Sequence, residues 1–445
     1  MKHIIILVLI FGALISNGQD CPQGNIYFYS QEEINIFPDS FPQCHEIPGS
    51  IFINSANGTV TDLSPLEGIT KINGGLRILN NPSLKSLTGL ENLIEVEDYL
   101  SIIDNDSLLS LEGLDNLTFA RKFVCDSNFM LQNIDNLTSL QYVSDTCRFR
   151  FLPELQNVNG LMNLDSVGGN LNFRYLPKLT DLTGLKNIKV IGHGLQLKQI
   201  GKIASLNGLQ NLTSVGFALN IEKNPNLASI NGLDNLRKIS STLRIINNNK
   251  LNSLDGLQSL TEIGKDINIF GNKNLKDLNA LSNVADFNGE IIIRNNFSLT
   301  DINGIAMIPA ENVKRLLLIN NDSLNVCDID LVCSMLEMPD SRISIFGNGS
   351  SCASKDTVSA QCGITGIADI KFKQLTIYPN PVRGTLYIEN YNSEIPYKIL
   401  DGFGRTLLSG HIDSKSQKTI DVSGLSGGIV FFKTSRFVYK IFLSN

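Results

Sequence analysis

The sequence contains no tryptophan and only four histidines. His3 lies near the N-terminus, and His45, His193 and His411 lie in three different parts of the chain, so the histidines cannot form a cluster with the spacing of a zinc site. The sequence also lacks the G-x-S-x-G, Walker A, dinucleotide-binding and H-E-x-x-H motifs. These absences argue against metallohydrolases, serine hydrolases and nucleotide-dependent enzymes. We therefore expect no catalytic residues, no metal site and no cofactor.

Positive charge and long apolar segments are scarce as well. The formal net charge is −6, which argues against a nucleic-acid partner, because such proteins carry a basic surface. The apolar run Ile4–Ile15 is too short to span a bilayer, and it follows Lys2 and precedes small residues up to Gly18. This arrangement predicts a secretory signal peptide over residues 1–18 and no transmembrane span in the rest of the chain.

A repeat of about 24 residues fills most of the remaining sequence. It is clearest in Leu219–Thr242, which reads LNIEKNPNLASINGLDNLRKISST. A fixed period of this length predicts a stack of coils that bury their apolar faces against each other. We expect about twelve coils over residues 51–325. After an irregular first copy, the coils begin at Leu76, Leu100, Phe123, Cys147, Leu171, Leu195, Leu219, Leu243, Ile267, Ile291 and Leu316.

The positions within one coil indicate its local structure. Positions 1 and 3 are apolar in every copy, which predicts a strand with inward odd residues and, after stacking, a parallel sheet. Positions 9, 12, 15, 18 and 21 are also apolar, and this spacing of three favours short extended or 3₁₀ pieces over a long α-helix.

Two further positions carry one residue type in most coils. Glycine at position 14 suggests a bend that side chains would resist, and asparagine at position 6 suggests a side chain that satisfies buried backbone groups after each strand. The glycines are Gly89, Gly113, Gly160, Gly184, Gly208, Gly232, Gly256 and Gly304, and the asparagines are Asn81, Asn105, Asn128, Asn224, Asn248, Asn272, Asn296 and Asn321.

Eight cysteines in an exported chain predict disulfide bonds. Cys21 and Cys44 flank a predicted strand, Ile26–Tyr29, and helix, Ser30–Phe41, and a bridge between them would close an N-terminal cap over residues 19–50. Cys125 and Cys147 lie inside the repeat, and either a bridge or two buried thiols fits their diagonal positions.

The other four cysteines belong to a C-terminal cap over residues 326–362. We expect a short helix over Val326–Leu336 and a last strand over Ile343–Phe346. Four cysteines allow three pairings, and the local spacing favours one of them. It joins Cys352 to Cys362 and leaves Cys327 with Cys333.

The repeat disappears after residue 362. Residues 363–374 form a predicted linker, and residues 375–445 contain seven short alternating segments separated by glycine, proline and asparagine. Seven short strands predict a small β-sandwich. The chain is therefore expected to be mainly β.

The coil pattern and the cap of a helix between two cysteines resemble leucine-rich repeats and, more closely, the receptor L domain of growth-factor receptors. This resemblance covers Cys21 to about Cys362 and implies a right-handed parallel β-solenoid that is used for binding. The chain has more coils than the receptors and no cysteine-rich module after them, so receptor signalling is not implied.

The C-terminal module resembles the type A C-terminal sorting domain of the type IX secretion system. The resemblance implies handling by the type IX secretion machinery, passage across the outer membrane, and a final location at the cell surface or in the medium. It rests on a series of short motifs, in which the residues that carry the match are Pro379, Asn380, Pro381, Gly404, Asp421, Gly428 and Lys440.

Three adjacent central coils differ from the others at the outward strand positions. Their cations would stack in a ladder, with two aromatic residues beside it and with Leu152, Leu176 and Ile200 in place of the position-6 asparagine. Such a ladder on an acidic protein suits an anionic ligand, unless Asp126 and Glu222 neutralise it. The candidate ligand-binding residues are Arg148, Arg150, Phe151, Arg174, Tyr175 and Lys198.

Three functions therefore remain open. The favoured hypothesis is a surface-displayed recognition or adhesion protein that binds an extracellular glycan or protein through the solenoid sheet. The alternatives are a structural spacer at the cell surface and a polysaccharide-degrading enzyme whose carboxylates converge only in the fold.

Overall fold

The computed structural model contains two compact units, residues 1–364 and residues 365–445. It describes residues 21–338, 342–364, 376–389, 395–402, 404–412, 419–434 and 438–444. The predicted signal peptide over residues 1–18 and the predicted linker from residue 365 onward lie outside the described residues. In the part of the chain that is described, no helix is long and apolar enough to cross a membrane.

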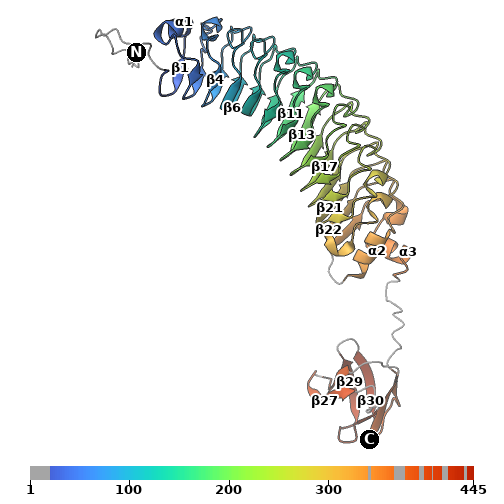
Figure 1. The fold of residues 1–445 in the computed structure, drawn as a ribbon. Coiled ribbons are helices and arrows are strands. Elements are labelled where there is room, and N and C mark those ends of the chain that lie inside the picture. Colours follow the sequence, from blue (N-terminus) through green and yellow to red (C-terminus); the bar gives the residue numbers. More distant parts are fainter. Residues whose placement is uncertain are drawn as a thin grey trace. The chain divides into compact units, whose positions relative to one another are not determined.

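The first unit is a curved solenoid whose long strands lie side by side on its concave side (Figure 1). These strands pair in parallel, each with the equivalent strand of the next coil, in the register that the repeat predicts: Leu219 faces Leu195 on one side and Leu243 on the other. We call this ladder the concave sheet. Its strands are β1 (Ile26–Phe28), β3 (Ile51–Ile53), β5 (Leu76–Leu79), β6 (Glu95–Ile103), β7 (Phe119–Asp126), β9 (Cys147–Arg150), β11 (Leu171–Leu176), β13 (Leu195–Ile200), β15 (Leu219–Glu222), β17 (Leu243–Ile246), β19 (Ile267–Phe270), β21 (Gly289–Arg294), β22 (Val313–Ile319) and β23 (Ile343–Phe346).

A second ladder of short parallel strands runs through positions 20 and 21 of the coils. This is the part of the coil where the spacing of three between apolar residues predicts short extended pieces. β6 and β7 are long enough to belong to both ladders. The other strands of the second ladder are β2 (Glu46–Ile47), β4 (Lys71–Ile72), β8 (Tyr142–Val143), β10 (Ser166–Val167), β12 (Val190–Ile191), β14 (Ser214–Val215), β16 (Lys238–Ile239), β18 (Glu262–Ile263) and β20 (Asp286–Phe287).

Between the two ladders many coils contain one turn of 3₁₀ helix, as the apolar spacing predicts. The 3₁₀ helices of the solenoid and its C-terminal cap are η1 (Ser64–Leu66), η2 (Asp135–Leu137), η3 (Asn159–Leu161), η4 (Thr183–Leu185), η5 (Asn279–Leu281), η6 (Asn303–Ile305), η7 (Ala310–Asn312) and η8 (Ser350–Cys352). The inward residues at positions 1 and 3 are 0% exposed from Leu76 to Leu318, so one continuous apolar core runs through these coils. Burial of this surface stabilises the stack, because no single coil could cover its own leucines.

The position-6 asparagines form two buried ladders of hydrogen bonds. The Asn248 side chain shows the pattern: its Oδ1 accepts from the backbone N–H of Asn224 at 3.0 Å, and its Nδ2 donates to the carbonyl of Ile221 at 2.9 Å. One ladder runs from Asn81 to Asn128 and the other from Asn224 to Asn348. This confirms that the asparagines satisfy buried backbone groups at the turn.

The position-14 glycines have a different cause from the expected bend. Only Gly89, Gly113, Gly208, Gly232 and Gly256 have a positive φ, between 107° and 115°. At all eight of these positions, however, a Cβ atom would lie 1.7–2.5 Å from a carbonyl oxygen of the preceding coil. Close approach of neighbouring backbones therefore explains the glycine better than the turn does.

Both ends of the solenoid are covered by caps. At the N-terminal end, α1 (Gln31–Ser40) begins after Ser30, whose side chain forms a capping box with Glu33, and the Cys21–Cys44 disulfide closes the cap as predicted. At the C-terminal end, α2 (Asp330–Glu337) begins later than the predicted Val326, because Val326 pairs with Asp301 of the preceding coil. The second cap helix, α3 (Lys355–Gln361), has Ser354 as N-cap and was not predicted.

The predicted pairing of the last four cysteines is wrong. The structure joins Cys327 to Cys352 and Cys333 to Cys362. The first bridge links residues that are one coil apart in the stack, and the second ties α2 to α3, so the stacked architecture overrides the short local spacing.

Cys125 and Cys147 are buried free thiols, so the alternative of a bridge between them is not realised. Cys125 faces Phe149 in the sheet and Cys147 faces Phe123, which leaves the two sulfurs on a diagonal. Burial raises the pKa of both thiols far above the usual range.

The second unit is the predicted β-sandwich of seven strands. One sheet has the order β24-β25-β28 and the other the order β27-β26-β29-β30, and their inner faces share one apolar core that includes Leu386, Ile399 and Phe432. The strands are β24 (Thr376–Tyr378), β25 (Thr385–Glu389), β26 (Ile395–Leu400), β27 (Thr406–Ile412), β28 (Thr419–Asp421), β29 (Gly428–Thr434) and β30 (Val438–Leu443).

The asparagine ladder gives a first testable prediction. Asn272→Ala removes the acceptor for the backbone N–H of Asn248 and the donor to the carbonyl of Ile245. We expect the free energy of unfolding to fall by on the order of 3 kcal/mol, because two buried backbone groups lose their partners. Urea unfolding followed by circular dichroism measures this change. The control is the exposed Asn252→Ala, for which we expect a change within about 0.5 kcal/mol; equal losses in both variants would contradict the role of the ladder.

The thiols give a second prediction. Because Cys125 and Cys147 are buried and their pKa values are raised, we expect iodoacetamide to label no cysteine in the folded chain. In urea without a reductant it should label two cysteines per chain, identified by peptide mass spectrometry. A labelled count of zero in urea would mean that these two sulfurs are bridged.

Candidate ligand-binding face on the concave sheet

The outward residues at position 4 of five central coils form a row of charges along the concave sheet. The strand register places Asp126, Arg150, Arg174, Lys198 and Glu222 side by side in that order. Neighbouring residues of such a row are separated by about 4.8 Å, the spacing of paired strands. The predicted cationic ladder therefore exists, and it has one carboxylate at each end.

These two carboxylates pair with cations of the row. Asp126 accepts from both Arg148 and Arg150, with 3.1 Å between its Oδ2 and Nη2 of Arg150, and its side chain is only 2% exposed. At the other end, Nζ of Lys198 lies 2.7 Å from Oε2 of Glu222. The acids thus neutralise part of the ladder, as the alternative interpretation of the sequence held.

Arg174 differs from the other cations. Among the described residues it has no carboxylate within ion-pair distance. Its buried Nε has no hydrogen-bond partner, a feature that it shares with Arg150. Its neighbours in the row are Arg150 and Lys198, which are cations as well. Four cations face two carboxylates in this group, so a positive charge is left over at its centre.

An aromatic pair lies next to the row. The rings of Phe151 and Tyr175, at position 5 of neighbouring coils, stack with 4.5 Å between their centroids and 18° between their planes. The guanidinium carbon of Arg150 lies 5.2 Å from the Phe151 ring centroid, and that of Arg174 lies 5.9 Å from the Tyr175 centroid. The Phe151 side chain is exposed, so the pair combines an accessible apolar surface with adjacent positive charge.

The backbone of both aromatic residues is in the left-handed region, with φ of 55° at Phe151 and 58° at Tyr175. Most coils place a residue at position 5 that tolerates this conformation, and bulky residues adopt it at a cost of about 1–2 kcal/mol. The tolerant residues are Asn80, Asp104, Asn247, Gly271, Asn295 and Asn320. Ser127, Gln199 and Lys223 adopt the same backbone conformation, so five neighbouring coils carry this strain, and Phe151 and Tyr175 are the two bulky aromatic residues among them. Backbone strain of this kind is typical of functional sites.

The asparagine ladder is interrupted beneath the same aromatic pair. Leu152, Leu176 and Ile200 occupy position 6 and are 0% exposed, and β11 and β13 continue through this position, where Leu176 pairs with Ile200. The second ladder resumes when Oδ1 of Asn224 accepts from the backbone N–H of Ile200. These three coils therefore lack the side-chain ladder of hydrogen bonds that the other coils have at this position.

Sequence reasoning missed an aromatic cluster at the N-terminal end of the concave sheet. Tyr27 stacks on Phe52 with 4.8 Å between ring centroids, and the Arg77 guanidinium lies 5.2 Å from the Tyr99 centroid and 6.0 Å from that of Phe52. Tyr27 belongs to the N-terminal cap, and Tyr99 comes just before Leu100, the first residue of its coil. Only the pairing of neighbouring strands in the folded solenoid brings the cluster together. A hollow of about 170 Å³ borders this cluster.

The C-terminal end of the concave sheet is mostly apolar. Phe270, Ile292 and Ile319 are partly exposed at outward positions, Phe346 is exposed, and the Arg294 guanidinium lies 4.7 Å from the Phe270 ring centroid. The concave sheet therefore has apolar and aromatic residues at both ends and charged residues at its centre.

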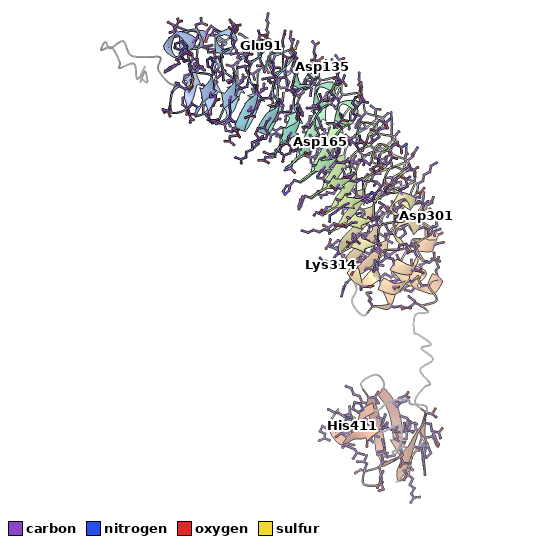
Figure 2. All side chains as sticks on the ribbon, viewed as in Figure 1. Glu91, Asp135, Asp165, Asp301, Lys314 and His411 are labelled. Atoms are coloured by element: carbon purple, nitrogen blue, oxygen red, sulfur yellow. A yellow bond between two sulfur atoms is a disulfide. The ribbon has the colours of Figure 1, made fainter. Side chains whose placement is uncertain are left out.

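Asp98 and Asp145 line a hollow beside Arg148, but other acidic loop residues lie away from the concave sheet. Glu91, Asp135 and Asp301 lie on the convex side of the solenoid (Figure 2). Within the described ranges no group of three histidine, cysteine or acidic side chains is arranged to hold a metal ion.

Two residues of the sorting motif, Asn380 and Lys440, meet at the last strand of the β-sandwich. The Asn380 side chain, between Pro379 and Pro381, donates to the carbonyl of Lys440 at 3.0 Å and accepts from the backbone N–H of Phe442 at 2.8 Å. It thus fixes β30 to the turn after β24.

Three other motif residues shape turns of the same unit. Gly404 and Gly428 have positive φ values of 82° and 143°, and Oδ1 of Asp421 accepts from the backbone N–H of Ser423 at 2.9 Å. These contacts give the motif residues a structural role in the sandwich.

Comparison with known proteins gives two findings. Residues 376–440 match the family model described as the secretion system C-terminal sorting domain. The chain is also similar to the crystal structure of an internalin from Listeria monocytogenes, with 19% sequence identity and a TM-score of 0.38 over 72% of this chain and 88% of that one. No curated protein matches the chain.

Proposed function

Because its C-terminal unit is a type IX secretion sorting domain, which makes the chain an exported protein of the cell surface or the medium, we propose that the solenoid is a recognition module. It binds a carboxylate-bearing ligand, an acidic glycan or an acidic stretch of a partner protein, on the central part of the concave sheet. The binding residues are Arg148, Arg150, Phe151, Arg174, Tyr175 and Lys198.

The observation that carries this proposal is the unpaired state of Arg174. A guanidinium between two other cations raises the electrostatic energy of the folded chain, and a carboxylate that approaches Arg174 removes this repulsion while it forms charge-assisted hydrogen bonds. Arg150 and Lys198 are already paired, so they orient Arg174 and strengthen the local field rather than form the first contact.

The aromatic pair supports the same location. Phe151 is exposed, and Tyr175 and Arg174 are partly exposed beside it. Aromatic residues and arginine are the residue types that dominate binding energy at interfaces. Phe151 and Tyr175 keep these side chains at positions where asparagine would cost the fold less, so a gain in binding explains their presence.

Charge reversal at Arg174 tests the proposal. With the full chain and polygalacturonate or polyglutamate as the probe, we expect Arg174→Glu to weaken binding by at least about tenfold, because the only unpaired cation of the row, among the described residues, is lost. Binding is measured by isothermal titration calorimetry, with the neutral glycan amylose as a probe that should not bind. Wild-type affinity should fall as the sodium chloride concentration rises.

The matched control is Arg237→Glu, an exposed arginine beside the short strand β16 and outside the concave sheet. We expect this variant to bind as the wild type does. Equal affinities for all three proteins, or no binding of either acidic probe by the wild type, would contradict the proposal and favour a spacer.

The strained aromatic pair gives a separate prediction. In the double variant Phe151→Asn/Tyr175→Asn, the relief of about 1 kcal/mol of backbone strain at each site offsets the loss of about 1 kcal/mol of ring stacking. We expect an unchanged or higher melting temperature together with at least about tenfold weaker binding of the acidic probe.

The control for this experiment places an aromatic residue in the same backbone conformation elsewhere. Asn247→Phe, at position 5 of another coil with φ of 57°, should lower the melting temperature and leave binding unchanged. If the double variant loses stability and binding together, the aromatic pair has a structural role and its assignment to the binding face is wrong.

A further inference from the structure

The four-stranded sheet of the β-sandwich has an outer face that is positively charged. Alternation along β26 points Tyr397 and Ile399 into the core and leaves Lys398 exposed. On the paired strand β29, Phe432 is buried and Lys433 is exposed. The strands β26, β27, β29 and β30 contain no aspartate or glutamate.

Two of these lysines face each other directly. Lys398 and Lys433 are register partners in the antiparallel pair of β26 and β29, so their side chains leave the same face about 5 Å apart. Lys440, on the next strand, faces Phe431 and is exposed on the same side. None of these three lysines has an ion-pair partner among the described residues.

This arrangement does not stabilise the fold. Like charges that lie directly opposite each other in a sheet are destabilising, and an oppositely charged residue at either position would form a stabilising cross-strand pair. The sandwich core does not require lysine here, because both side chains point away from it. A hollow of about 390 Å³, lined in part by Lys398, Lys433, Leu400 and Thr406, lies on this side of the sheet.

We propose that this lysine face, formed by Lys398, Lys433 and Lys440, docks an acidic protein surface of the type IX secretion machinery that handles the sorting domain. Carboxylates held by a folded partner would neutralise the opposed lysines and recover the energy that their repulsion costs. His411, labelled in Figure 2, pairs with Pro396 in the sheet and is exposed on the same face.

A folded protein partner fits these observations better than an anionic lipid surface. Mobile head groups would be attracted equally well by lysines dispersed over the surface, without the cost of two opposed cations. The opposed lysines are held at fixed positions on the paired strands β26 and β29, and such an arrangement matches carboxylates that a folded partner holds at fixed positions. The inference is independent of the ligand of the concave sheet, because it concerns a different unit of the chain.

Three variants of the full chain, produced in the bacterium that makes it, separate charge from stability. Lys398→Glu replaces the opposed lysines by a carboxylate–ammonium pair, so we expect a higher melting temperature of the sandwich but reduced export. Lys398→Glu/Lys433→Glu restores a like-charge pair with the opposite sign, so stability should be close to that of the wild type and export should fall most, by at least about tenfold. Lys398→Arg/Lys433→Arg keeps the charge and should match the wild type in both measurements.

Export is measured as the fraction of the chain at the cell surface and in the medium compared with the periplasm, and stability by thermal unfolding of the purified full chain. The expected result is that the exported fraction depends on the sign of the charge on the lysine face, whereas the melting temperature does not. Normal export of Lys398→Glu/Lys433→Glu would overturn the proposal. So would export that rises and falls with the melting temperature, or variants that lose binding to vesicles of anionic phospholipid but are exported as the wild type is.

Discussion

The stacking of equivalent residues in successive coils is the constraint on which the rest of the solenoid depends. Each strand of the concave sheet pairs with the next in the same register, so every position of the repeat becomes a row of residues about 4.8 Å apart. An inward row of leucine and isoleucine forms a continuous core, and a row of asparagine forms a ladder of hydrogen bonds. The same constraint brings outward residues together whether or not their contact is favourable.

The central coils keep the register of the stack but carry residues that the fold itself does not favour. Three cations in a row, two aromatic residues with a left-handed backbone and three apolar residues in place of asparagine occur in the same coils. At each of these positions the residue present suits the local backbone or its neighbours less well than the usual residue of the repeat. Because they occur together, a shared function explains them better than three independent accidents do.

Much of this fold follows from the sequence, because the repeat fixes the period, the inward positions and the rows. The seven strands of the sandwich, the N-terminal capping box and the Cys21–Cys44 bridge were predictable for similar local reasons. The pairing of Cys327 with Cys352 and of Cys333 with Cys362 was not, since it depends on how the last coil and two short helices meet in space. The candidate site was predictable as a set of residues, but not the distribution of its ion pairs. That distribution depends on which carboxylate each side chain reaches, and it singles out Arg174.

The close approach at the position-14 glycines has a consequence for how such a protein can evolve. Eight coils meet the preceding coil at such a glycine, with a carbonyl oxygen where a Cβ atom would have to be, and Asn136 and Ala280 occupy this position in two others. A gain or loss of one whole repeat leaves all of these junctions intact, whereas an insertion of a few residues next to a glycine disturbs two coils at once. The length of the solenoid is therefore free to change by duplication or deletion of complete units, and the caps can be reused without alteration.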